Sequence, residues 1–239
     1  MPLEILVVIP AYNEGDRLPR YLEELCKLFQ TQSITPLFYI VDDGSNAFHR
    51  NKLEEAVSRL KKEYPRLNLQ SLPKNIGKGG AIRAGWKDSK NFDWIAFLDA
   101  DGAIPAYEVL RVIQMLSPKS PSIFTCRIKM LGRKIERHLY RHLMGRVFAT
   151  LTSILFKIPV YDSQCGFKLI RRSSYEKIEL IMSENGFVID VELMILLMRT
   201  GESLQEIPVD WKDIPGSKVS LIIDPFKMIL SLIRLHYRN

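Results

Sequence analysis

The chain has 239 residues, of which 46% are hydrophobic and 26% are charged, and its formal net charge is +7 at neutral pH. This length fits one large α/β domain or two small ones, and the composition excludes an intrinsically disordered chain. The positive charge predicts anionic partners: a nucleotide, phospholipid headgroups or a nucleic acid. The three cysteines, Cys26, Cys126 and Cys165, are odd in number and lack metal-ligand spacing. We therefore expect a reducing compartment and no zinc site or disulfide framework.

Two observations bear on membrane association. Residues 1–10 have no positively charged leader region and run directly into a predicted strand, so no signal peptide is expected. The longest apolar stretch, Val147–Phe156, reaches about half of the roughly 20 residues that a spanning helix needs. We expect a cytoplasmic protein that is soluble or peripheral on the cytoplasmic face of a membrane.

The first half of the chain alternates short β-branched runs with amphipathic patterns. The runs predict strands at Ile5–Ile9, Leu37–Val41, Leu67–Leu72, Trp94–Leu98 and Ser122–Cys126. The patterns predict helices near Gly15–Phe29, Arg50–Glu63, Gly80–Lys87 and Ala106–Leu116. This alternation is typical of a mainly parallel sheet with helices on both faces.

The pattern changes after residue 126. Residues 127–146 are helical in pattern and hold seven Lys or Arg residues against one acid, Glu136. Further strands are predicted at Gly166–Arg171 and Ser203–Val209, and a helix at Val188–Arg199 that stops at Gly201. Because no linker rich in Gly, Ser or Pro divides the chain, residues 1–220 are expected to form one domain, followed by an amphipathic helix at 221–239.

Two motifs follow the first two strands. Pro10–Glu14 brings an aromatic ring, Tyr12, to a place where it could face a planar base, with an ordinary strand-to-helix turn as the alternative. In Val41–Ser45, Asp43 could accept hydrogen bonds from a base or a ribose. Its neighbour Asp42 is expected to serve turn chemistry, with the serine as a helix cap.

Anion and metal chemistry is suggested by the next two motifs. Asn75–Gly80 opens a helix with glycines and Lys78, which suit an anion, although the Walker spacing is absent and a ligand-free glycine turn is the alternative. Asp99 and Asp101 follow a buried strand, where ligands of α/β sheets bind. Alone, the pair could be solvated turn residues. With the other motifs, it predicts Mg²⁺ or Mn²⁺ held against a diphosphate.

Three later clusters are polar. Asp162–Lys168 pairs an acid with a glycine just before a strand. Gly186–Glu192 starts a helix, and its acids could simply complement the helix dipole. Trp211–Lys218 is a turn-forming loop with two lysines, suited either to closing over phosphates or to being solvated.

The C-terminal segment predicts a helix from Asp224-Pro225 to Tyr237. One polar stripe holds Lys227, Ser231, Arg234 and Arg238, while Phe226, Ile229, Leu230, Ile233 and Tyr237 lie elsewhere around the helix. A wide apolar face with basic edges suits a lipid interface, and packing on the domain or on a second subunit is the equal alternative. The segment 133–156 has the same ambiguity, but the row Arg133, Arg137 and Arg141 favours anionic lipid or a phosphate.

Read in this order, the motifs resemble the family 2 glycosyltransferases of GT-A fold, from Ile9 to about Lys218. Within that family they are most similar to the polyprenyl-phosphate glycosyltransferases. Asp99–Ala103, Asp162–Lys168 and Ile214–Lys218 are similar to the dolichyl-phosphate β-glucosyltransferases in particular. The resemblance implies a Rossmann-like α/β sheet with a nucleotide-binding half at 1–126 and an acceptor-binding half at 127–220. It also implies inverting, metal-dependent transfer of a hexose, glucose from UDP-glucose, to a polyprenyl or dolichyl phosphate.

The motifs and the resemblance together give roles to individual residues. The expected nucleotide-sugar contacts are Pro10, Ala11, Tyr12, Glu14, Val41, Asp43, Lys78, Asp99, Ala100, Lys212 and Lys218. The expected catalytic residues are Asp101, Asp162, Asp190 and Arg127, and the metal ligands are Asp99 and Asp101. Arg127, Arg137 and Arg141 are expected to hold the acceptor phosphate, because guanidinium groups match phosphate oxygens well.

Several alternatives remain open. Mannosyl relatives place a metal-liganding Gln where this chain has Ala103, which weakens a GDP-mannose reading and leaves water, phosphates or another residue to complete the metal shell. If the acceptor is a glycan hydroxyl, a carboxylate base is required, and Asp190 or Asp162 would serve. A non-catalytic sugar-nucleotide-binding or membrane-associated module, and a homo-oligomer, are further possibilities. Nucleic-acid binding is not expected, since the basic stretch lacks aromatic residues interleaved in a recognised nucleic-acid-binding module.

Overall fold

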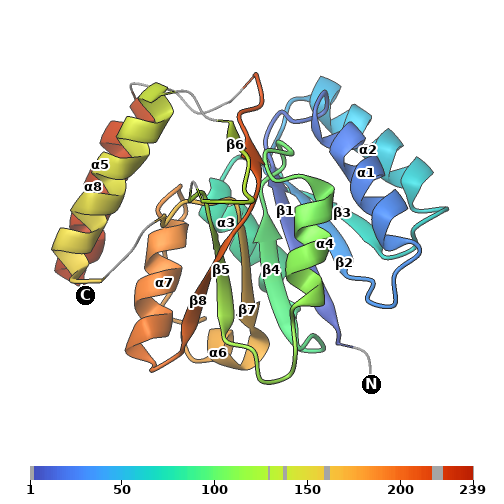
Figure 1. The fold of residues 1–239 in the computed structure, drawn as a ribbon. Helices are drawn as coiled ribbons and strands as arrows, with labels where there is room; N and C mark the ends of the chain where they lie inside the picture. Colours follow the sequence, from blue (N-terminus) through green and yellow to red (C-terminus); the bar gives the residue numbers. More distant parts are fainter. Residues whose placement is uncertain (1–2, 129, 137–138, 159–161, 217–222, 239) are drawn as a thin grey trace.

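A computed structural model describes residues 3–128, 130–136, 139–158, 162–216 and 223–238 (Figure 1). Within these ranges the strands are β1 (Ile5–Ala11), β2 (Leu37–Asp42), β3 (Leu67–Ser71), β4 (Trp94–Leu98), β5 (Ser122–Cys126), β6 (Ile135–Glu136), β7 (Phe167–Arg171), β8 (Leu204–Pro208) and β9 (Trp211–Lys212). The helices are α1 (Leu18–Phe29), α2 (Ala47–Leu60), α3 (Lys78–Trp86), α4 (Ala106–Gln114), α5 (Leu139–Phe156), α6 (Arg172–Glu176), α7 (Ile189–Arg199) and α8 (Ile223–Arg238).

The described strands form a seven-stranded sheet in the order β3-β2-β1-β4-β7-β5-β8, and β6 pairs separately with β9. β7 runs antiparallel between β4 and β5, while the other recorded pairings in the large sheet are parallel. The expected mostly parallel α/β sheet is therefore confirmed. The second half of the chain contributes a central strand to it, so both halves share one sheet.

Helices cover both faces of the sheet, and the strand sequences show why. In β1, Ile5, Val7 and Ile9 join one apolar core with α1, α2 and α4, whereas Leu6 and Val8 join a second core with α3 and α7. Because alternate residues of a strand point to opposite faces, an uninterrupted apolar run fits a strand buried on both sides. α5 and α8 lie side by side at one end of the sheet (Figure 1).

Helix boundaries differ from the predicted ones where capping decides them. α2 begins before Arg50, because the side chain of Asn46 accepts a hydrogen bond of 3.1 Å from the His49 amide. The expectation that Ser45 caps this helix is therefore wrong. Ser45 Oγ instead accepts a hydrogen bond of 2.8 Å from the Asn13 amide. Three short elements, β6, β9 and α6, were not predicted from sequence, since runs of two to five residues show no periodicity.

In the part of the chain that the structure covers, no helix combines the length and the apolar character needed to cross a bilayer.

Candidate active site

A cavity of about 860 Å³ opens at the carboxyl ends of β1 and β4. Eight of the expected nucleotide-sugar contacts line it: Pro10, Ala11, Tyr12, Glu14, Asp43, Lys78, Asp99 and Ala100. The expected catalytic residue and metal ligand Asp101 lines it too. The second half of the chain adds Arg127 and Asp190. The ends of parallel strands meet at one edge of a sheet, which is why motifs far apart in sequence converge here.

Asp99 is held by contacts on both sides of its carboxylate. Its Oδ1 lies 2.9 Å from the Lys78 ammonium, and its backbone amide donates a 2.8 Å hydrogen bond to the Gly166 carbonyl. A Cβ atom at residue 166 would lie only 2.4 Å from Asp99 Oδ2. The glycine before β7 is therefore required for the carboxylate to occupy this position.

Asp101 lies in an electrostatically unfavourable place for a carboxylate. Burial, and then the nearby Asp99 charge, raise its pKa, although a hydrogen bond from the Ala103 amide and the charge of Arg17 oppose the rise. That hydrogen bond is 3.0 Å long. A bound cation would stabilise the charged form of this buried carboxylate, and the partly exposed Asp99 beside it offers further oxygens.

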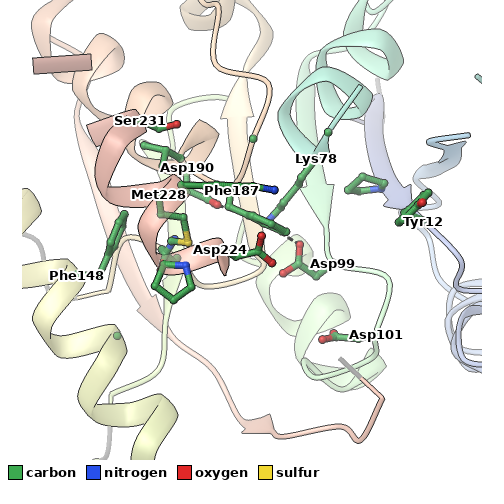
Figure 2. A pocket seen from close by; sticks show the side chains of 18 of the residues that line it. Tyr12, Lys78, Asp99, Asp101, Phe148, Phe187, Asp190, Asp224, Met228 and Ser231 are labelled. Carbon is green, nitrogen blue, oxygen red and sulfur yellow. Dashed lines mark hydrogen bonds and ion pairs between the residues drawn. The ribbon is translucent and has the colours of Figure 1, made fainter. Parts of the chain in front are cut away.

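Asp99, Lys78 and Asp190 line the cavity with alternating charges (Figure 2), and the buried Lys168 continues this series behind its wall. Lys78 Nζ lies 3.4 Å from Asp190 Oδ2, and Lys168 Nζ lies 3.0 Å from Asp190 Oδ1. Lys168 is fully buried and also donates to the Cys165 carbonyl at 2.6 Å. Burial alone would lower the pKa of Lys78, but Asp190 and Asp99 outweigh it and raise that pKa, so the ammonium stays charged.

Arg127 and Asp162 form a second, bidentate ion pair. Arg127 Nε and Nη2 each lie 2.7 Å from an Asp162 oxygen, and the Arg127 amide donates to the same carboxylate at 2.9 Å. Burial by itself would raise the pKa of Asp162, yet the Arg127 charge and hydrogen bonds hold it well below its usual range. Only Arg127 of this pair lines the cavity, and Asp162 lies behind it.

The expected nucleoside contacts differ in how many interactions they already make within the protein. The Tyr12 side chain is 44% exposed at the cavity wall, so its ring is available to a ligand. Asp43 accepts hydrogen bonds from the amides of Ile76 and Gly77, at 2.7 and 2.9 Å, which fix the glycine-rich loop beside it. Glu14 forms a bidentate ion pair with Arg17.

Other expected site residues lie elsewhere or outside the described part. Val41 is buried in the second apolar core and does not line the cavity. The Lys212 side chain is exposed and pairs with Glu136 at 3.5 Å, away from the cavity wall. Arg137, Lys218 and the side chain of Arg141 fall outside the described residues.

The cavity also contains residues that the sequence did not mark as a site. Arg17 contacts the Pro215 carbonyl at 3.2 Å and so connects the first helix to the loop after β9. Its spacing of three from Glu14 was an available signal. The largest omission is α8, which lines the cavity with Asp224, Pro225, Lys227, Met228, Ile229, Leu230, Ser231 and Arg234. Figure 2 shows Asp224, Met228 and Ser231 on the same cavity as the acid pair.

The mixed sheet and its acidic, lysine-containing cavity fit a glycosyltransferase of GT-A fold, the class that the comparisons with known proteins show. The sequence model described as "Glycosyl transferase family 2" matches residues 6–179. The chain belongs to glycosyltransferase family 2.

Curated relatives are similar over almost the whole chain. A dolichyl-phosphate β-glucosyltransferase of Trichomonas vaginalis is 33% identical over 237 residues, which cover 96% of this chain and 72% of the relative. The enzyme of the same name from Saccharomyces cerevisiae is 32% identical over 248 residues, 97% of this chain and 74% of its own. The human enzyme of this name is 30% identical over 230 residues, which cover 90% of this chain and 69% of the relative.

Solved structures share the fold at lower identity. Glucosyl-3-phosphoglycerate synthase from Mycobacterium tuberculosis, crystallised with Mn²⁺, UDP and glucosyl-3-phosphoglycerate, superposes with a TM-score of 0.70 at 13% identity. The alignment covers 98% of this chain and 80% of that one. Mannosyl-3-phosphoglycerate synthase from Rubrobacter xylanophilus gives a TM-score of 0.69 at 15% identity, covering 99% and 73%.

Proposed function

We propose that this glycosyltransferase moves glucose from UDP-glucose to a dolichyl or related polyprenyl phosphate, with inversion at the anomeric carbon. One observation carries the proposal: Asp99, Asp101 and Lys78 line the same cavity as residues of the segment Pro10–Glu14. The names of the curated relatives support the acceptor and the sugar. In this proposal the half up to residue 126 binds the donor, and the remainder, including α8, binds the acceptor.

The donor contacts follow from the cavity wall. The segment from Pro10 to Glu14 would hold the uracil and ribose, with the Tyr12 ring against the base. Asp43 has both oxygens engaged by loop amides, but each oxygen can accept a further hydrogen bond from a ribose hydroxyl. Lys78 and Arg127 would face the diphosphate, and the Mn²⁺-bound and UDP-bound neighbour supports a nucleoside diphosphate here.

The residues present fit a divalent cation. Asp99 and Asp101 offer carboxylate oxygens on the cavity wall, and a bound cation would oppose the effect of burial and of the Asp99 charge, which raise the pKa of Asp101. Among the described residues no group of three or more His, Cys, Asp or Glu side chains could form a complete metal shell. Mg²⁺ or Mn²⁺ would therefore be held by these two acids and by donor phosphates and water, and it would neutralise charge on the leaving diphosphate.

The chemistry requires charge stabilisation more than proton transfer. An ionised acceptor-phosphate oxygen attacks the anomeric carbon, and the bond from that carbon to UDP breaks with its electron pair leaving on UDP. Lys78 and Arg127 stabilise the negative charge that develops there. The acceptor oxygen is already ionised at neutral pH, so no general base is needed.

The environment of the two carboxylates favours this acceptor over a glycan hydroxyl. A hydroxyl acceptor needs a base, and Asp190 and Asp162 are the ones that the sequence offers. Asp190 lies between two lysines, and Asp162 is held by Arg127 with a lowered pKa. Both carboxylates are therefore already engaged by cations, and its lowered pKa makes Asp162 a poor base.

We further propose a peripheral position on the cytoplasmic face of a membrane. Exposed apolar side chains gather on the paired helices α5 and α8: Val147, Ile154, Phe226, Ile229, Leu230, Ile233 and Tyr237. Such a surface suits a lipid interface from which a polyprenyl phosphate could be taken. A contact between two copies of the chain would cover the same surface.

The test compares substrates and one variant. UDP-glucose and GDP-mannose are each supplied with a short-chain polyprenyl phosphate or with a soluble glycan, with and without Mn²⁺. We expect transfer from UDP-glucose to the polyprenyl phosphate, and a loss of at least about 10²-fold in kcat for Asp101→Ala. Lys119→Ala, an exposed change at the opposite edge of the sheet, is the control. Unchanged turnover in the Asp101 variant would refute the proposal.

A further inference from the structure

The charges on the cavity wall divide into two groups. On the sheet side, three cations are each paired with a carboxylate: Arg17 with Glu14, Lys78 with Asp99 and Asp190, and Arg127 with Asp162. The same wall carries the further acids Asp43 and Asp101. This side is suited to a cation and a donor, but its positive charge is already compensated. A second anionic substrate therefore needs another source of positive charge.

α8 supplies that charge, since it brings two cations to the cavity against one acid, Asp224. Lys227 and Arg234 line the cavity, and within the described residues neither has a recorded hydrogen bond or ion pair. They are seven residues apart with Ser231 between them, a spacing that places the three side chains on one face of a helix. An ammonium, a hydroxyl and a guanidinium on one face form a set of donors for phosphate oxygens.

Apolar side chains continue the cavity beyond these cations. Val147, Phe148 and Leu151 of α5 and Met228 of α8 line the same cavity, and Figure 2 shows Phe148 and Met228 on its α5–α8 side. An anion-binding face next to an apolar surface matches a phosphomonoester that carries an apolar chain.

α8 is attached to the domain firmly enough to act as a wall. Leu232 and Leu235 are buried in the second core, and Arg238 forms an ion pair with the buried Glu192 of α7. The opposite wall, with Lys78 and Asp99, is therefore faced by a fixed surface.

We propose that Lys227 and Arg234 of α8 bind the acceptor's phosphate group, opposite the donor side of the cavity, and that the α5–α8 side receives its apolar chain. This inference rests on the proposed function, because it assigns the acceptor of that reaction. The acceptor site is thus formed with α8, whereas the sequence motifs indicate only arginines of the segment 127–141.

The test uses Lys227→Gln and Arg234→Gln, singly and together. The double variant Lys90→Gln/Lys119→Gln is the matched control, since it removes the same charge from exposed residues outside the cavity. We expect the acceptor KM to rise about 10- to 100-fold in each single variant and further in the double one, as for loss of a charged hydrogen bond. The KM for UDP-glucose should stay within about twofold of the control, and Arg234→Lys should restore part of the loss.

Equilibrium binding separates this proposal from the proposed function. Citronellyl phosphate and inorganic phosphate are titrated into the wild type and the variants, with UDP as a third ligand. We expect the phosphate monoester to bind more tightly than inorganic phosphate, and only these two ligands to weaken in the α8 variants. Equal binding of both would refute the apolar part of the site.

Two results would overturn the assignment of the cations. The first is that the α8 variants bind the acceptor as tightly as the control double variant does. The second is that the α8 variants lose UDP binding but keep acceptor binding. A wild type that binds citronellyl phosphate through these residues but transfers no glucose to it would instead refute the proposed reaction alone.

Discussion

Asp99 depends on a residue that has no side chain. Gly166, just before β7, lies against the carboxylate of Asp99, and its carbonyl accepts the Asp99 amide. This glycine follows Asp99 by 67 residues, so no local sequence pattern connects the two positions. The local sequence identifies Asp99 as a candidate ligand. The pairing of β4 with β7 determines where its carboxylate oxygens lie.

Gly166→Ala should therefore reduce catalysis without unfolding the protein. The new methyl group would meet only Asp99 atoms among its three nearest neighbours, at 2.4, 2.6 and 2.9 Å, so the carboxylate must shift. We expect kcat/KM to fall about 10- to 100-fold, the usual cost of displacing a group that supports a metal or substrate ligand.

Gly201→Ala provides the control for that substitution. Gly201 has a φ of 76° and nothing near its missing Cβ, so alanine there costs about 1–2 kcal/mol of stability through backbone strain alone. Its kcat/KM should match the wild type. Full activity in Gly166→Ala would show that Asp99 tolerates displacement.

At the scale of elements, α8 has one buried side and one exposed side. Leu232 is 1% exposed within the second core, whereas Leu230 is 54% exposed. The helical pattern of the sequence predicted this element and its polar stripe. It did not show that the stripe borders the cavity, because that depends on how the helix packs on α5 and α7.

Leu232→Ala should lower the free energy of unfolding by about 2–5 kcal/mol, as expected for a large-to-small change in a packed core. Leu230→Ala should change it by no more than about 0.5 kcal/mol, because the side chain is mostly solvated. Urea unfolding followed by circular dichroism measures both. Equal effects of the two substitutions would mean that α8 does not pack as described.

At the scale of the whole molecule, a net charge of +7 accompanies the exposed apolar surface of α5 and α8. The sedimentation of the protein with anionic vesicles should therefore weaken as salt rises. Phe226→Ser/Leu230→Ser should bind vesicles at least about tenfold more weakly than the wild type, since it removes two exposed apolar side chains.

Leu180→Ser/Ile181→Ser is the matched control for vesicle binding, because both side chains are exposed on a turn outside these helices. It should bind vesicles like the wild type. If the α8 variant also binds normally, the apolar surface does not contact lipid. A wild-type dimer that the α8 variant dissociates would instead identify a surface between two copies.

Much of the fold could be predicted because patterns within single segments of the sequence determine it. The five strands before residue 127 were predicted to within two residues at each end, since each is an apolar run or, for β3, an alternating one. The convergence of Tyr12 and Asp99 followed from the rule that ligands bind at the carboxyl ends of strands.

What could not be predicted depends on long-range packing. Lys168 reads as an ordinary strand residue, and only the fold shows it buried against Asp190. Val41 belongs to the same motif as Asp43 but is buried in the second apolar core. Both outcomes depend on which face of a strand meets which helix, and no single segment of sequence contains that information.

The insertion of β7 between β4 and β5 has a consequence for synthesis on the ribosome. Until residue 171 has left the exit tunnel, the growing chain has a bare β4 edge and a β5 strand without its neighbour. An open edge of this kind invites pairing with other nascent chains. Nascent fragments that end shortly before β7 should thus be those that most need chaperones.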